Sequence, residues 1–151
     1  MIQRIQSLYL MVVAVLMTIM LFTPMASLTA TESVDAARFD VWGIHFANGN
    51  SISLLYFGIL VGLTGGLSLA IVMLYKKRKL QLQLCYALEV LLIGVLVFEL
   101  FYGYQLFTTD GYTVDFSPIL LLPLFSIPLV WLASRGIIKD IALLKSYDRV
   151  R

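Results

Sequence analysis

The chain has 151 residues, of which 60% are hydrophobic and 13% are charged. A water-soluble domain averages roughly half apolar residues and about a quarter charged ones. A small soluble core cannot bury so much apolar surface, because small domains have a high ratio of surface to volume. The composition therefore excludes an ordinary soluble domain and indicates a protein whose solvent is the lipid bilayer.

Cysteine and histidine are each present once, as Cys85 and His45. An intramolecular disulfide needs two cysteines, and a zinc site needs a cluster of Cys or His ligands. The spacing of the acids in the outer loops and His45 matches neither a set of metal ligands nor a catalytic triad. We therefore predict that it is not an enzyme and that it has no catalytic, cofactor-binding or metal-binding residues.

Four stretches are long and apolar enough to cross a membrane, which takes about 20 helical residues. They cover approximately residues 6–24, 52–75, 80–102 and 118–134. Between and after them lie two outer loops, 26–51 and 103–117, and a tail, 135–151. We predict an all-α membrane protein in which a four-transmembrane-helix bundle forms a single domain.

The basic residues predict how these spans are oriented, because Lys and Arg near span ends stay in the cytoplasm. Ten of the eleven fall on one side of the predicted spans: Arg4, Lys76, Lys77, Arg78, Lys79, Arg135, Lys139, Lys145, Arg149 and Arg151. Arg38 alone falls on the other side. Both termini are therefore predicted to be cytoplasmic.

The first span has a second interpretation as a cleaved signal peptide, because Arg4 precedes an apolar stretch that small residues follow. The apolar run is long for such a peptide. Cleavage after Ala30 would put Leu28 at a position that requires a small residue. We favour a retained span, although its removal would leave the other three helices in the same orientation.

Small residues recur every four positions along the second span, at Gly58, Gly62, Gly66 and Ala70. Such a stripe lets helix backbones approach closely, which gives van der Waals contact within the membrane. We predict that the stripe packs against another helix of the same bundle. Contact with a second copy or with another membrane protein is the alternative.

Two prolines, Pro123 and Pro128, are placed inside the fourth span. Each would remove one backbone hydrogen bond and free the carbonyl four residues earlier, at Ile119 and Leu124. We therefore expect a bent helix. The amphipathic residues after Arg135 either continue this helix or lie on the cytoplasmic membrane surface.

Glu89 lies within the third span, about 13 Å from Leu80 at the inner boundary. This depth is close to the midplane of a core about 30 Å thick. A charged carboxylate there is costly, so we expect Glu89 to be protonated. It would then donate a hydrogen bond to Ser126 or to the Leu124 carbonyl. Such a bond would hold helices together, whereas a proton-carrying site is the functional alternative.

Glu99 lies near the outer end of the same span. The basic candidate on that side is Arg38, with His45 as a second if it is protonated. We predict that Glu99 lies at the membrane interface and approaches Arg38 or water.

The outer loops contain strand-forming stretches at residues 27–31, 38–44 and 112–116. The first two could form a hairpin to which the third adds a strand. We favour such a small extracytoplasmic β-hairpin or sheet as a cap over the bundle. The alternative is an irregular loop with Trp42 and Phe46 anchored at the membrane interface.

The first ten residues, the Trp42-Gly43-Ile44 element, the basic turn at 76–79 and the basic tail carry a resemblance to a known family. The chain resembles a Bacteroidetes family of small four-span inner-membrane proteins catalogued as a domain of unknown function. This resemblance implies a multi-pass protein of the bacterial inner membrane. It implies no activity, substrate or site residues.

Two functions follow as hypotheses. The first is a structural or accessory subunit of a membrane assembly, whose partners are the lipid bilayer and a membrane protein or a second copy. The alternative is a small transporter or proton-conducting protein that uses Glu89 and a bent fourth helix. Nucleic-acid binding is not indicated, because the topology already explains the basic residues at the span ends.

Overall fold

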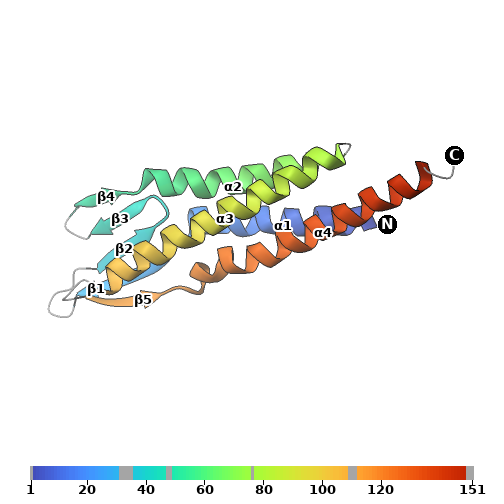
Figure 1. Ribbon diagram of the computed structural model, residues 1–151. Helices are drawn as coiled ribbons and strands as arrows, with labels where there is room; N and C mark the ends of the chain where they lie inside the picture. The colour runs from blue at the N-terminus through green and yellow to red at the C-terminus, as the bar shows by residue number, and fades with distance from the viewer. Residues whose placement is uncertain (1, 31–35, 47–48, 76, 109–111, 149–151) are drawn as a thin grey trace.

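The computed structural model describes residues 2–30, 36–46, 49–75, 77–108 and 112–148. Its four long helices are α1 (Ile2–Phe22), α2 (Leu55–Met73), α3 (Arg78–Phe107) and α4 (Leu122–Asp148). Each is long and apolar enough to cross a membrane. They run alongside one another in an elongated bundle (Figure 1). The four predicted helices are therefore confirmed.

Each helix packs against two others, since α1 and α3 both contact α2 and α4. The side chains of Leu10, Met17, Val61, Leu88 and Val130 are completely buried between them. Large apolar side chains also cover the outside of all four helices, and many of them are about half exposed. An apolar core inside an apolar outer surface is compatible with a bilayer and unfavourable in water.

Five short strands form one antiparallel sheet at one end of the bundle, which we call the sheet end (Figure 1). They are β1 (Ala26–Ala30), β2 (Ala36–Asp40), β3 (Gly43–Phe46), β4 (Ser51–Ser53) and β5 (Tyr112–Phe116), in the order β4-β3-β2-β1-β5. The predicted hairpin with an added strand is confirmed. The predicted strand at 38–44 is instead two strands, because the chain turns between Asp40 and Gly43, which pair with each other.

Alternating side chains attach the sheet to the bundle, as expected when successive residues point to opposite faces. Leu28 and Phe39 are buried, whereas Ser27, Thr29 and Arg38 are exposed. The buried residues join the same apolar core as the helices. The sheet is therefore packed on the bundle rather than suspended from it.

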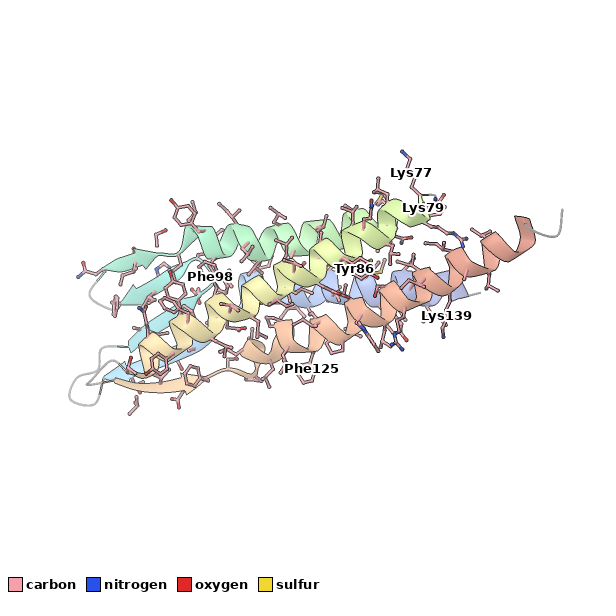
Figure 2. All side chains as sticks on the ribbon, in the orientation of Figure 1. Lys77, Lys79, Tyr86, Phe98, Phe125 and Lys139 are labelled. Atoms are coloured by element: carbon pink, nitrogen blue, oxygen red, sulfur yellow. The ribbon has the colours of Figure 1, made fainter. Side chains whose placement is uncertain are left out.

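The start of α1, the end of α4 and the turn between α2 and α3 lie at the end opposite the sheet (Figure 1). Lys77, Lys79 and Lys139 also lie toward that end (Figure 2). We call it the basic end. These three lysines lie away from the sheet, as the charge pattern predicted, whereas Arg38 lies on β2.

Three helices extend beyond their predicted spans, and the first helix begins at Ile2 rather than at residue 6. The third ends at Phe107 rather than near residue 102, and the fourth continues through the predicted tail to Asp148. The amphipathic segment after Arg135 therefore continues the helix, which was the first of the two alternatives. Its side chains remain part of the bundle, because Ile137 is fully buried and Asp140 is 8% exposed.

The role predicted for Pro123 is wrong. A 3₁₀ turn, η1 (Pro118–Leu121), precedes α4 and puts Pro123 in the first turn of that helix. The first backbone N–H groups of a helix have no partner within it, so proline removes nothing there. The Ile119 carbonyl accepts a hydrogen bond from the Leu122 amide. Pro128 does lie inside α4, where it cannot donate to the Leu124 carbonyl.

Candidate functional site

The two carboxyl groups of α3 are the first candidates for a site. Glu89 is partly exposed, and its Oε1 atom is buried without a hydrogen-bond partner among the described residues. Ser126 is fully buried, but its hydroxyl donates to the Leu122 carbonyl of its own helix at 2.8 Å. The predicted bond between Glu89 and Ser126 is therefore wrong, because Glu89 Oε1 has no partner among the described residues and the Ser126 hydroxyl is directed at its own helix.

Residues at a similar depth on the other helices do not form a layer around Glu89. Ala14 and Ser126 face the interior, with exposed fractions of 3% and 0%. Gly66 lies on the outside of α2 instead. The direction of each side chain depends on how the helix is rotated about its axis, which its depth along the helix does not determine.

Glu99 is more deeply buried than Glu89, with only 2% of its surface exposed. Its Oε1 atom is likewise buried and has no hydrogen-bond partner in the described part of the chain. Arg38 is exposed on β2, and no ion pair joins it to Glu99. The predicted approach of Glu99 to Arg38 is wrong, whereas its contact with water stays a prediction. Because α3 continues to Phe107 and contacts β5, protein covers the carboxyl group.

Beside Glu99 lies an open pocket with a volume of about 450 Å³. We call this cavity the Glu99 pocket. It is lined by Glu99, Leu100, Gly103, Tyr104, Phe116 and Leu120. These residues come from the end of α3, from β5 and from η1. Apart from the carboxyl group and the Tyr104 hydroxyl, the side chains are apolar. Ligand pockets typically have volumes of about 300–1,000 Å³, so the size suits a small amphiphile.

The small residues on α2 divide into two groups. Gly58 is buried under the Trp42 ring, where an added Cβ would lie 2.7 Å from Cε3 of that ring. An added Cβ at Gly62 or Gly66 would meet nothing within 4 Å among the described residues, and Ala70 is exposed. Gly58 therefore packs against the sheet rather than against another helix, and the described residues show no helix packed on Gly62 or Gly66.

The helical repeat explains this division. Residues four apart differ in direction by about 40°, since a helix turns about 100° per residue. A strict four-residue stripe therefore winds away from the bundle. The inner face uses Thr64, Gly65 and Ser68 instead, all of them buried. The Ser68 hydroxyl donates to the Leu10 carbonyl of α1 at 2.6 Å.

Sequence reasoning missed the interactions that close the basic end. Arg78 Nη1 lies 3.5 Å from Asp140 Oδ2, which joins the start of α3 to α4. The Gln6 side chain packs onto Gly136, where an added Cβ would lie 2.7 Å from Gln6 Cγ. An acid on the apolar face of the amphipathic tail was the available signal for the ion pair, because such an acid needs a partner.

The exposed face of the sheet does not form a recognisable catalytic or metal site. His45 Nε2 lies 4.0 Å from Asp40 Oδ2, and both side chains are accessible to solvent. In the described ranges, no three His, Cys, Asp or Glu residues are grouped so that they could hold a metal ion. The two carboxyl groups of α3 and the outer face of α2 remain the features that the fold itself does not explain.

Comparison with known families adds one finding. A family model described as "Domain of unknown function (DUF4293)" matches residues 2–150. The chain belongs to this family. The match covers all four helices and the sheet, so the resemblance to a domain of unknown function is confirmed over nearly the whole DUF4293 chain. No curated protein matches the chain.

Proposed function

We propose that this DUF4293 protein is a multi-pass protein of the bacterial inner membrane, from the Bacteroidetes group, with both termini in the cytoplasm. Its proposed role is that of a structural or accessory subunit in a membrane assembly. The apolar outer surface of the bundle supports a membrane location. The basic end, opposite the sheet, supports the orientation.

Reporter fusions test the orientation. A fusion at Lys77 and one at the C-terminus should read cytoplasmic, and a fusion at Asp35 should read periplasmic. A periplasmic signal at Lys77 would contradict the proposed topology.

One observation carries the accessory role. Gly66 and Ala70 are exposed on α2 and Gly62 is partly exposed, so the three form a small-residue face on this helix. Within a membrane, helix association depends on close backbone approach, which small residues permit. The described fold does not use this face, because no described residue lies within 4 Å of a Cβ added at Gly62 or Gly66. It suits a helix of a partner protein or of a second copy.

Affinity purification from native membranes in mild detergent tests this role. The wild-type chain should bring down a stoichiometric partner or form a stable oligomer. Gly62→Leu and Gly66→Leu should abolish that association yet leave thermal stability close to wild type, because open space receives the new side chains. Ala87→Leu is the matched control, since Ala87 is exposed on α3. Retention of the association in both glycine variants would contradict the proposal.

Proton conduction is the second candidate function. It is supported by the buried Oε1 atoms of Glu89 and Glu99, neither of which has a hydrogen-bond partner among the described residues. The two residues are ten apart on α3, which corresponds to about 15 Å along the helix axis. A proton could pass between them only through intervening water. If the chain conducts protons, Glu89→Gln should abolish pH-driven flux into liposomes, and absence of flux in the wild type would rule the function out.

A further inference from the structure

The Glu99 pocket combines a buried acid with apolar walls. The Oε1 atom of Glu99 has no hydrogen-bond donor within the described chain, although the residue is only 2% exposed. Burying such a group without a partner is unfavourable, so these groups usually have a protein, water or ligand partner. The open volume of about 450 Å³ beside it provides space for that partner.

We propose that the Glu99 pocket binds a membrane lipid whose headgroup ends in a primary ammonium, as in phosphatidylethanolamine. The Glu99 carboxylate pairs with the ammonium group. Leu100, Phe116 and Leu120 contact the upper part of an acyl chain. This role is independent of whether the chain joins a larger assembly.

The depth of Glu99 matches the headgroup boundary. Glu99 lies 19 residues after Leu80, which corresponds to about 29 Å along α3. The hydrocarbon core of a bilayer is about 30 Å thick. With Leu80 at the inner boundary, the carboxyl group is therefore level with the start of the acyl chains on the sheet side. A lipid headgroup can reach it there without entering the middle of the membrane.

The mouth of the pocket faces the surroundings of the bundle. Leu100 is 62% exposed, Tyr104 is 70% exposed and Phe116 is 47% exposed, although all three line the pocket. Exposed apolar groups at the end of a spanning helix face lipid or the membrane interface. The pocket therefore opens sideways to lipid, and a lipid reaches it more directly than a soluble molecule does.

Charge and hydrogen bonding select the headgroup. An ammonium group offers three donors and a positive charge, whereas a carboxylate only accepts. The trimethylammonium of phosphatidylcholine has the charge but no N–H donor. Phosphatidylglycerol has no positive charge to pair with Glu99, and no Lys or Arg lines the pocket. A primary ammonium is therefore the best complement.

Native mass spectrometry of the full-length protein tests this proposal. The protein is reconstituted into vesicles containing equal parts of phosphatidylethanolamine, phosphatidylcholine and phosphatidylglycerol, then extracted in mild detergent. The wild type should retain phosphatidylethanolamine with a preference of about tenfold over phosphatidylcholine. Glu99→Gln should remove that preference, because it keeps the shape of the side chain but not its charge.

Two further variants separate binding from folding. Glu89→Gln makes the same chemical change on α3 outside the pocket, so it should retain the wild-type preference. Gly103→Leu should reduce lipid retention by filling the pocket, where an added Cβ already lies 4.0 Å from Phe116 Cε1. Thermal melting confirms that each variant is folded.

Equal retention of the three lipids by the wild type would overturn the proposal, as would an unchanged preference in Glu99→Gln. Dodecylammonium, which has a primary ammonium and an alkyl chain but no phosphate, is added as a competitor. It distinguishes a phospholipid from a simpler ammonium amphiphile as the ligand. Binding of dodecylammonium without any retention of phosphatidylethanolamine would overturn the lipid assignment. Displacement of retained phosphatidylethanolamine by dodecylammonium would support it.

Discussion

The two ends of the bundle differ in whether a buried acid has a partner within the described chain. At the basic end, Asp140 is 8% exposed and lies 3.5 Å from the Arg78 guanidinium. Toward the sheet end, Glu99 is 2% exposed and its Oε1 atom has no partner in the described chain. The first acid has the partner that burial requires within the fold. The second has no such partner among the described residues, which is why we assign it to a ligand.

Packing differs between the ends in the same way. An added Cβ at Gly136 would lie 2.7 Å from Gln6 Cγ, so the basic end is tightly filled there. An added Cβ at Gly103 would first meet Phe116 Cε1 at 4.0 Å. Tight packing around an acid in an ion pair is typical of a structural contact. An open pocket beside an acid without a partner in the fold is typical of a binding site.

Removal of Arg78 should have the largest effect. Arg78→Leu leaves Asp140 buried without its cation and should lower the free energy of unfolding by about 2–3 kcal/mol in detergent. Breaking a buried pair costs about 3–5 kcal/mol, and the partial exposure of Arg78 reduces that value. Lys77→Leu is the control, since Lys77 is an exposed neighbour. Equal effects of the two substitutions would show that the ion pair does not stabilise the basic end.

Gly136→Val should lower the free energy of unfolding by about 1–2 kcal/mol, because the new side chain must displace the buried Gln6. Chemical unfolding in detergent measures the change. The double variant Gly136→Val, Gln6→Ala should recover part of the loss, because alanine leaves room for the valine. No recovery would mean that the clash lies elsewhere.

Glu99→Leu should raise the free energy of unfolding by about 1 kcal/mol in delipidated detergent, because it removes a buried acceptor without a partner. Asp140→Leu should do the reverse, since it leaves Arg78 unpaired. The same unfolding assay compares both variants. If Glu99→Leu destabilised the chain as much as Asp140→Leu does, the contrast between the two acids would be lost.

Gly103→Ala should have the smallest effect, a gain of about 0.5 kcal/mol. Alanine favours the helix over glycine by about 0.5–1 kcal/mol, and its methyl group fits the pocket without a clash. A loss of stability would indicate that the pocket is narrower than the structure shows.

Much of the fold was predictable from local patterns. Four apolar stretches predicted four helices, because length and hydrophobicity need no tertiary information. Alternating residues predicted β1 and β5 and a single strand at 38–44 that merged β2 with the start of β3. The three-residue strand β4 was missed, because it is too short for a period to be recognised. The continuation of α4 past Arg135 stayed open because a lone amphipathic helix suits either a bundle or a surface.

The candidate sites were less predictable. Counting along a helix gave the depths of Glu89 and Glu99, but not which way their side chains point. The same limit applies to the small-residue stripe, where Gly58 packs against Trp42 and Gly66 faces outward. Because residues four apart differ in direction by about 40°, one four-residue pattern can begin on the buried face of a helix and end on its exposed face.

The amino-acid sequence by itself indicated that this chain has four apolar helices, a sheet formed by strands of its two outer loops and most of its basic residues at one end. These features depend on hydrophobicity, alternation and charge, which are properties of short segments. Only the tertiary structure decided that Asp140 is paired, that Glu99 is buried beside an open pocket and that Ser126 bonds within its own helix. Those outcomes depend on how each helix is rotated against its neighbours, which is set by packing between residues far apart in the chain.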